Sequence, residues 1–402
     1  MSHNFMVIGG SSGQVPAIMA AKKLGLNTIV IDKNSNCPGS EIADYFESVD
    51  TTNLEEALRV AKKYNVCGSI TISSDIGVLT SCYINEFLGL PNQGLGIGMK
   101  VTNKALMRRR FEMEGVNSPY YVATDCNEDV ASVSRKIEDD KKKYPMIVKP
   151  SDSSGSRGVT KIKNESELKY AIELACKFSR NGKVVVEEFV KGREIGAQCF
   201  SKDGRMVYCF VHNDKVSKNL VPVGHSFPSL ENDKVLSNVM QECDKALTSL
   251  GIVNGPSNID IIVDEQNTPY IIEIGARIGA TKLPELVNYH SGIDIIEKTI
   301  QLSSGVDVRV EDTTHYSVAV EMIFFEKGGR VKNIENYDDI LKKYSPLEFN
   351  LDLRTGMDVK ELESGVDVYG HAICKGKTAR EAEMFCNKLV EEVKAKIQFC
   401  ED

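Results

Sequence analysis

The chain has 402 residues, of which 42% are hydrophobic and 26% charged, and its formal net charge is -8. This length exceeds what one ordinary core supports, so two or three domains are expected. The acidic balance disfavours nucleic acid and anionic membranes as main partners, since neither attracts a negative surface. The sequence also has no apolar run near the roughly 18 residues that a membrane-spanning helix needs.

The cysteines predict a reducing environment. The sequence contains 11 of them, scattered singly between Cys37 and Cys400 without a CxxC pair. This pattern favours free thiols over a disulfide framework. The first residues, MSHNFMVIGG, lead directly into a strand and lack the basic and apolar parts of a signal peptide. We therefore expect a cytoplasmic protein.

The first hundred residues alternate between strand-like and helix-like segments. Strands are expected at 5–10, 27–32 and 68–73, and helices at 13–25, 54–65 and 76–90. This alternation predicts a parallel sheet covered by helices on both faces. The last hundred residues predict a small α+β unit, with strands at 315–325 and 365–374 and an amphipathic helix at 378–397.

The turn GGSSG at 9–13 joins the first strand to the first helix, and Asp32 ends the next strand. It resembles the dinucleotide-binding fingerprint GxGxxG, but Ile8 stands where the first glycine is required. The helix N-terminus after Gly10 could bind an anion, and a tight turn without a ligand explains the same residues. Both interpretations stay open, and the evidence for NAD is weak.

A second glycine-rich stretch, VKPSDSSGSRGV at 148–159, belongs to the middle part of the chain. A P-loop lysine follows its glycines, whereas Lys149 precedes them at the end of an apolar strand. From there a lysine can reach the phosphates of a nucleotide, while a flexible Ser/Gly hairpin closes over them with backbone N–H donors. A mobile polar hairpin without a ligand is the alternative.

The segment KVVVEEFVKGRE at 183–194 predicts a buried strand that runs out to an edge. Adenine recognition needs exposed backbone and a carboxylate, and a second carboxylate further on can accept the ribose hydroxyls. These features fall on Glu187, Glu188, Phe189, Val190 and Glu194. Edge-strand acids that face water are the alternative.

Asp260 and Glu273 lie within apolar runs, IDIIV and YIIEI, on two strands joined by a turn. A carboxylate in such a run is unfavourable unless it is paired or bound to a metal. Two hard oxygen ligands on adjacent strands suit Mg²⁺ carried by a nucleotide. Arg277 follows closely enough to bind a phosphate or carboxylate in a bidentate way. Lys104, which begins a predicted helix, would alone pass for ordinary surface charge.

Taken together, these residues resemble the ATP-grasp superfamily, and the resemblance covers nearly the whole chain. It implies an α/β fold in three parts: a parallel pre-grasp domain at 1–98, an ATP-grasp domain at 99–305 and a small α+β domain at 306–402. The grasp domain would have two subdomains, with the lid subdomain at about 115–190. In this fold ATP lies between two sheets, which explains why Lys149 precedes its loop.

The resemblance also implies roles for individual residues. The nucleotide lysines would be Lys104 and Lys149, and the lid loop would be Ser151–Gly158, with Ser153, Ser154, Gly155 and Ser156 as ATP contacts. The adenine and ribose positions would be Glu187, Glu188, Phe189, Val190 and Glu194. Asp260 and Glu273 would hold Mg²⁺ or Mn²⁺ with the ATP.

One position departs from the pattern. Many members have Asn two residues after the second metal acid, where this chain has Gly275. EIGAR at 273–277 is more similar to the branch of amino-acid ligases and formate-dependent purine enzymes. There a Glu and an Arg four positions later serve the metal and the transition state, which implies a catalytic role for Arg277. VGHSFPS at 223–229 is similar to that branch's substrate loop and would place His225, as a second catalytic residue, beside the reacting carboxylate.

The implied activity is that of a ligase. A small carboxylate, such as an amino acid, attacks the γ-phosphorus of ATP to give an acyl phosphate, and an amine then displaces phosphate to form an amide. Small-molecule carboxylate and amine substrates are expected, without nucleic acid or membrane partners, and a homodimer is left open. The sequence identifies neither the substrates nor a general base.

Two alternatives remain. A formate- or bicarbonate-using enzyme of the purine-biosynthesis type has the same EIGAR, but the first domain shows no basic cluster for a phosphoribosyl group, and 197–208 lacks the bicarbonate region of biotin carboxylases. A non-catalytic ATP-binding module is the other alternative. The presence of both lysines, both metal acids and Arg277 argues against it.

Overall fold

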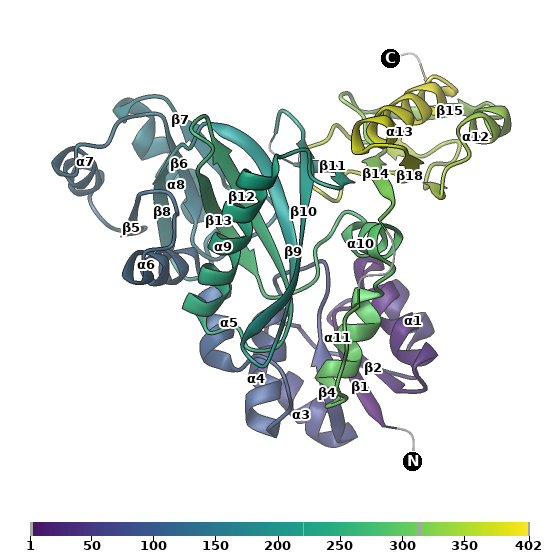
Figure 1. Cartoon of the computed structure of the whole chain (residues 1–402), viewed down its shortest axis with the longest axis horizontal. Helices are drawn as coiled ribbons and strands as arrows, with labels where there is room; N and C mark the ends of the chain where they lie inside the picture. The colour runs from purple at the N-terminus through teal and green to yellow at the C-terminus, as the bar shows by residue number, and fades with distance from the viewer. Residues whose placement is uncertain (1–2, 220, 312–314, 401–402) are drawn as a thin grey trace.

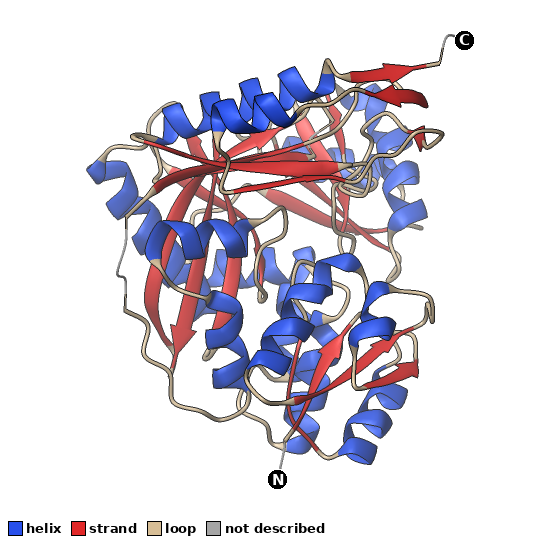
Figure 2. Cartoon of the chain, turned by 90° about the vertical axis from the view of Figure 1, so that its right-hand side faces the viewer, coloured by secondary structure: helices blue, strands red, loops and turns tan. Residues whose placement is uncertain are grey.

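The computed structural model describes residues 3–219, 221–311 and 315–400. These residues form four sheets with helices around them, and the N- and C-terminal ends lie at opposite ends of the molecule (Figures 1 and 2). None of the helices in these ranges is long and apolar enough to cross a membrane.

The N-terminal region is a parallel sheet with the strand order β3-β2-β1-β4. Its strands are β1 (Asn4–Ile8), β2 (Asn27–Asp32), β3 (Tyr45–Ser48) and β4 (Val66–Ile70), with helices η1 (Ser12–Gln14), α1 (Val15–Lys23), α2 (Pro38–Ile42), α3 (Leu54–Tyr64), α4 (Val78–Leu88) and α5 (Leu95–Val101). Phe5 and Val7 of β1 belong to the core with α1, whereas Met6 and Ile8 belong to the core with α3. The predicted parallel sheet with helices on both faces is confirmed.

A second, antiparallel sheet follows with the order β5-β8-β6-β7. Its elements are β5 (Tyr121–Asp125), α7 (Val130–Asp139), β6 (Met146–Pro150), β7 (Thr160–Ile162), η2 (Glu165–Glu167), α8 (Leu168–Phe178) and β8 (Lys183–Glu188). Its core is formed by the strands together with α7 and α8. Helix α6 (Lys104–Glu114) precedes this sheet in the chain.

The largest sheet has eight antiparallel strands in the order β13-β12-β9-β10-β11-β14-β18-β16. Its strands are β9 (Gly192–Lys202), β10 (Arg205–Val216), β11 (Pro222–Phe227), β12 (Gly255–Asp264), β13 (Pro269–Gly275), β14 (Ser317–Met322), β16 (Glu348–Leu351) and β18 (Gly370–Gly376). The C-terminal strands β14, β18 and β16 thus extend the sheet that begins in the middle of the chain. The middle and C-terminal regions therefore share one sheet.

Helices cover this sheet on both sides. They are α9 (Asp233–Leu250), α10 (Leu283–Ser291), α11 (Ile295–Ser303) and α13 (Ala379–Lys394). Figure 1 shows α9 crossing in front of the central strands, and Figure 2 shows α13 lying over the C-terminal strands. The remaining elements are α12 (Asp338–Tyr344) and the small sheet β17-β15-β19, formed by β15 (Gly329–Ile334), β17 (Asp358–Val359) and β19 (Ile397–Phe399).

The central strands of this sheet have one apolar face and one polar face, and the candidate site includes residues of the polar face. Ile195 and Ala197 of β9, together with Ile259 and Ile261 of β12, join the core formed with α6 and α9. Side chains alternate along a strand, so the residues between them point to the other face. On that second face lie Glu194, Gln198, Asn258, Asp260, Glu273, His212, Asp214 and His225. We call this surface the polar face.

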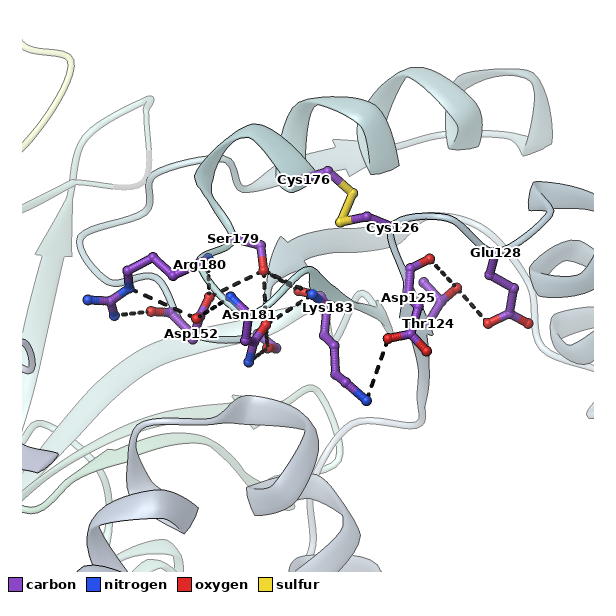
Figure 3. The surroundings of a disulfide bond; sticks show 11 residues. Thr124, Asp125, Cys126, Glu128, Asp152, Cys176, Ser179, Arg180, Asn181 and Lys183 are labelled. Atoms are coloured by element: carbon purple, nitrogen blue, oxygen red, sulfur yellow. Dashed lines mark hydrogen bonds and ion pairs between the residues drawn. A yellow bond between two sulfur atoms is a disulfide. The ribbon is translucent and has the colours of Figure 1, made fainter.

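A disulfide joins Cys126, which follows β5, to Cys176 near the end of α8 (Figure 3). The prediction that the cysteines are free thiols is therefore wrong for this pair, and the other cysteines are free. The two cysteines lie 50 positions apart, and no sequence pattern around either of them predicts this disulfide.

Candidate active site

Lys104 lies at the first turn of α6, where the Asn103 side chain caps the helix by accepting from the N–H of Ala105 and Leu106. The Lys104 N–H donates to the Ser151 carbonyl at 2.7 Å. Its Nζ donates to the Ser153 carbonyl at 2.7 Å and lies 2.7 Å from Glu273 Oε1. The structure therefore brings the first predicted nucleotide lysine together with the lid loop and with a predicted metal acid.

Lys149 belongs to a buried three-residue ion cluster with Glu187 and Arg108. Lys149 Nζ lies 2.8 Å from Glu187 Oε2, and Arg108 Nε lies 2.9 Å from Glu187 Oε1. Arg108 Nη2 also donates to Glu187 Oε2 at 3.2 Å. All three side chains are at least nine-tenths buried, so each charge depends on the others for compensation.

The charges of this cluster do not cancel. Burial opposes ionisation of Glu187, but Arg108 and Lys149 together hold the pKa of its carboxyl below the usual value. Burial lowers the pKa of Lys149, Glu187 acts in the opposite direction, and Arg108 adds to the lowering. Two cations and one anion leave a net charge of +1 in the cluster. A buried site of this kind favours a bound anion such as a phosphate.

Arg108 was missed by sequence reasoning. Its Nη2 donates to the carbonyl of Ile272 at 2.6 Å, and its Nη1 to that of Ile271 at 3.4 Å. Arg108 therefore ties α6 and β8 to β13, the strand that carries Glu273. Its position relative to Lys104 could have indicated its role. Residues i and i+4 share one face of a helix, so Arg108 lies on the same face of α6 as Lys104.

The predicted adenine segment divides between two sides of β8. Glu187 faces the ion cluster, whereas the Glu188 carboxylate accepts from the Tyr120 N–H at 3.2 Å and lies 3.0 Å from Lys142 Nζ. The ring of Phe189 lies under Lys161, with Nζ 3.2 Å from the ring centroid. The side chains of Glu188 and Phe189 are thus engaged elsewhere, and Val190 is half-buried. The backbone N–H and C=O groups of this segment are therefore the groups that could contact an adenine base.

Glu194 lies on the polar face of β9, opposite Ile262 of β12. Its side chain is exposed to solvent. The pKa of its carboxyl is nevertheless raised, because neighbouring protein atoms desolvate the group and because Asp214 is negatively charged. A carboxylate at this position can accept hydrogen bonds from hydroxyl groups.

Asp260 and Glu273 are direct partners across the β12–β13 pair. Desolvation and the negative charges of Glu273 and Asp214 raise the pKa of Asp260 to about 7, while Asn258 Nδ2 donates to Asp260 Oδ1 at 3.0 Å. Crowded carboxylates repel one another, and a divalent cation between them relieves that repulsion. Because the donors are hard oxygens, the residues fit Mg²⁺ or Mn²⁺.

Arg277 is held by a residue of the N-terminal region. Its Nε and Nη2 donate to Oδ1 and Oδ2 of Asp75, both at 2.9 Å. Burial works against ionisation of Asp75, but Arg277 keeps the pKa of that carboxyl below its usual value. A Cβ atom on Gly275 would lie 2.8 Å from Asp75 Oδ1, so the glycine leaves room for the pair. Asp75 was not predicted from the sequence.

The lid loop is anchored at its first residues and leads to an exposed tip. The Ser151 hydroxyl donates to Asn181 Oδ1 at 2.9 Å, and the Asp152 carboxylate accepts from the N–H groups of Arg180 and Asn181 at 3.0 and 2.9 Å (Figure 3). The Ser154 carbonyl accepts from Arg157 Nε at 3.0 Å. At the tip, Gly155 and Ser156 have positive φ values of 67° and 57°.

His225 lies on β11, on the same polar face as Asp260. Its Nδ1 is 2.6 Å from Asp214 Oδ1. The register places β10 and β9 between His225 and Asp260, so the structure brings this predicted catalytic residue to the same surface as the predicted metal acids.

The glycine turn of the first domain is filled by protein atoms. The Gly10 N–H donates to Asp32 Oδ2 at 2.8 Å, so this donor of the turn is already used. A Cβ atom on Gly10 would lie 2.3 Å from Cys37 Sγ, and one on Gly39 would lie 2.7 Å from Gly10 Cα. These contacts favour the tight turn without a ligand.

Comparison with known proteins agrees with this architecture. Residues 101–281 match the ATP-grasp domain, and residues 321–398 match the L-amino acid ligase C-terminal domain 2. The L-arginine-specific L-amino acid ligase of Bacillus subtilis is 21% identical over 289 residues, which cover 69% of this chain and 69% of that protein.

Several solved structures are similar over the full length of the chain. The L-amino acid ligase from Bacillus licheniformis has a TM-score of 0.81 at 18% identity and is covered to 99%. The phosphoribosylglycinamide synthetase from Anaerococcus prevotii has a TM-score of 0.78 at 25% identity and is covered to 100%. The chain therefore combines an ATP-grasp domain with an L-amino acid ligase C-terminal domain.

Proposed function

We propose that this chain activates a small carboxylate, such as an amino acid, as an acyl phosphate with ATP and joins it to an amine, releasing ADP and phosphate. The observation that carries this proposal is the contact of Lys104 with both the lid loop and Glu273, the cross-strand partner of Asp260, in a chain with an L-amino acid ligase C-terminal domain.

The charges of the site suit this chemistry. Two anions, the carboxylate and the γ-phosphate, must approach each other, so positioning and charge neutralisation are the main tasks. Lys104 and Lys149 would bind phosphate oxygens, and Arg277 would face the transferring phosphoryl group or the carboxylate. Mg²⁺ or Mn²⁺ held by Asp260 and Glu273 would neutralise further phosphate charge.

ATP binding would rearrange one ion pair. Lys104 lies 2.7 Å from Glu273, so a phosphate bound to Lys104 and a cation bound to Glu273 would replace this contact. The backbone of Glu187–Val190 would bind adenine, and Glu194 the ribose hydroxyls. The lid tip around Gly155 would close over the phosphates.

A second candidate is a formate- or bicarbonate-using enzyme of the purine-biosynthesis type. The full-length similarity to phosphoribosylglycinamide synthetase does not favour it over an amino-acid ligase, because a glycinamide is an amide of the amino acid glycine. The Gly10 N–H already donates to Asp32, so this donor of the N-terminal turn is not available to a phosphate. A non-catalytic ATP-binding module is the third candidate, and ATP turnover separates it from both enzymes.

The experiment is a pairwise screen. Each proteinogenic L-amino acid is supplied as the carboxylate, alone and with each of the others as the amine, and phosphate release is measured with Mg·ATP. Formate and bicarbonate are included as alternative acids. We expect release when one amino acid acts as the acid and an amino acid acts as the amine, and a single amino acid can fill both roles.

A further inference from the structure

Two buried histidines share one carboxylate oxygen on the polar face. Asp214 of β10 lies opposite His225 of β11 in the sheet register. Asp214 Oδ1 is 2.6 Å from His225 Nδ1 and 2.8 Å from His212 Nδ1. Ligand atoms around one tetrahedral metal ion lie about 3.3 Å apart for metal–nitrogen bonds of about 2.0 Å. The observed separations are shorter and are those of hydrogen bonds and ion pairs.

The proton on His212 can be assigned from its neighbours. The Gly279 N–H donates to Gln198 Oε1 at 3.1 Å, which makes Gln198 Nε2 the donor side of that amide. Gln198 Nε2 lies 3.3 Å from His212 Nε2. His212 Nε2 therefore accepts, and the ring carries its proton on Nδ1, toward Asp214. Nε2 of His212 thus has a hydrogen-bond partner, and its Nδ1 lies at ion-pair distance from Asp214.

His225 differs from His212 in this respect. Its Nδ1 donates to Asp214, and within the described parts of the chain no protein group forms a hydrogen bond with its Nε2. Burial lowers the pKa of His225 below its usual value although Asp214 opposes this effect. The ring is thus neutral at physiological pH, with a lone pair on Nε2 that can accept a proton.

The same network reaches a predicted metal acid. Gln198 Nε2 donates to Asn258 Oδ1 at 2.7 Å, and Asn258 Nδ2 donates to Asp260 Oδ1 at 3.0 Å. Gly196 stands between Asp260 and His212 in the register, and a Cβ atom there would lie 2.3 Å from His212 Cε1. The arrangement therefore fixes His225 relative to the strand that would hold the metal.

We propose that His225 Nε2 is the general base that accepts a proton from the amine substrate, and that Asp214 is a positioning residue that fixes the tautomer and orientation of His225. This assignment rests on the proposed function. The substrate ammonium gives one proton to Nε2, and the amine attacks the carbonyl carbon of the acyl phosphate. The new C–N bond forms, the C–O bond breaks with its electron pair on the departing phosphate, and that phosphate takes the second N–H proton.

The first test compares two nucleophiles in His225→Gln. Hydroxylamine is uncharged at neutral pH and needs no base, whereas an amino acid amine must lose a proton. With each L-amino acid as the acyl donor, we expect His225→Gln to keep hydroxamate formation within about threefold and to lose amide formation by about 10²–10⁴-fold, the range typical of general-base catalysis. Equal losses with both nucleophiles would overturn the assignment.

The control is His371→Gln. Nε2 of His371 on β18 lies 3.4 Å from Oε2 of Glu348 on β16, so the two residues form a second histidine–carboxylate pair of the same sheet. We expect this variant to form hydroxamate and amide at wild-type rates. A selective loss of amide formation in His371→Gln would show that the effect does not depend on the position of His225.

The second test concerns Asp214 and does not require turnover. In ¹⁵N-edited NMR of the wild-type protein, we expect the His225 ring to carry its proton on Nδ1, and Asp214→Asn to shift the population toward the Nε2–H tautomer. Asp214→Asn should also reproduce the selective loss of amide over hydroxamate formation. A wild-type ring protonated on Nε2 would overturn the inference, because it leaves no lone pair for the amine proton.

The two tests distinguish the failure of this inference from failure of the proposed function. If the chain is not a carboxylate–amine ligase, the wild-type protein forms neither hydroxamate nor amide from any amino acid, and the base assignment falls with it. If only the inference is wrong, the wild-type protein is active and His225→Gln loses both products equally.

Discussion

The guanidinium of Arg277 is held by both oxygens of Asp75, a residue 202 positions earlier in the chain, through contacts of 2.9 Å each. A paired arginine of this kind has little freedom to rotate, and Gly275 leaves the space that the pair requires. The N-terminal region thereby orients a cation that lies next to the predicted metal strand. Preorganised charge of this kind stabilises negative charge that develops in a transition state.

Arg277→Ala is expected to lower kcat while leaving ATP affinity nearly unchanged. Loss of one preorganised charge typically lowers the rate by about 10²–10³-fold. Arg277→Lys should restore little of the lost rate, because the point charge of an ammonium group does not reproduce the planar, two-pronged guanidinium. Steady-state kinetics together with calorimetric titration of an ATP analogue would measure both. Lost ATP binding with spared chemistry would instead assign Arg277 to the nucleotide pocket.

Glu273→Gln is expected to abolish turnover in a folded protein. The substitution keeps the shape of the side chain but removes one charge of the Asp260–Glu273 pair. Glu265→Gln is a suitable control, because Glu265 lies in the turn between the same two strands and pairs with exposed Lys191 at 2.6 Å. Wild-type phosphate release by Glu273→Gln at saturating Mg²⁺ would contradict the metal assignment.

Arg108→Met is expected to destabilise the fold and weaken ATP binding. It removes one member of a buried cluster and leaves Glu187 with Lys149 alone, so the net charge of +1 disappears. Breaking a buried ion pair typically lowers the free energy of unfolding by about 3–5 kcal/mol. Arg109→Met is the matched control, since this neighbour is exposed. Chemical denaturation and nucleotide titration that give the same values for both variants would rule out the role of Arg108.

The lid loop is expected to gain protection from hydrogen exchange when an ATP analogue binds. Ser151 and Asp152 are already fixed by the 179–181 segment, whereas Gly155 at the tip is exposed. Amides at 153–157 should therefore exchange more slowly with the analogue present, while those of 151–152 should change little. Unchanged exchange across the loop would count against closure over the phosphates.

The contact between α10 and the C-terminal strands is expected to weaken in acid. The hydrogen bond with His371 and the charge of Lys282, together with the Tyr289 hydroxyl at 3.0 Å, lower the pKa of Glu348 from 4.5 to about 2. A lowered carboxyl pKa stabilises the fold above about pH 4.5, and this contribution is lost as the pH falls toward 2.

Glu348→Gln should therefore lower the free energy of unfolding at neutral pH by at most about 3 kcal/mol, and by less after solvent screening. The difference from the wild-type protein should shrink as the pH falls from 4.5 toward 2. Denaturation curves at several pH values would measure it, and a difference that does not depend on pH would exclude the ionised Glu348 as its source.

The sequence predicted those features that depend on local pattern. The alternation of the first hundred residues was sufficient for a parallel sheet, and PYIIEIG was predicted as the strand that became β13. Asp260 and Glu273 stood out because charged residues interrupted apolar strands. The boundaries shifted where a strand began later than its pattern did, as in 365–374, where β18 begins only at Gly370.

The features that were missed depend on contacts between distant segments. Asp75 and Arg277 come from different regions, and neither Arg108 nor Asp214 interrupts an apolar run, so each could pass for surface charge. The disulfide of Cys126 and Cys176 also joins separate elements. Only the fold brings these pairs together, because helix and strand periodicity describe one element at a time.

The most direct test of the account is product analysis of the pairwise substrate screen by mass spectrometry with phosphate detection. The account predicts that one or more amino acid–amine pairs give ADP, phosphate and an amide whose mass is the sum of the two substrates less one water, in equal amounts. ATP bound tightly with no phosphate release for any pair, formate and bicarbonate included, would contradict it and identify a non-catalytic nucleotide-binding protein.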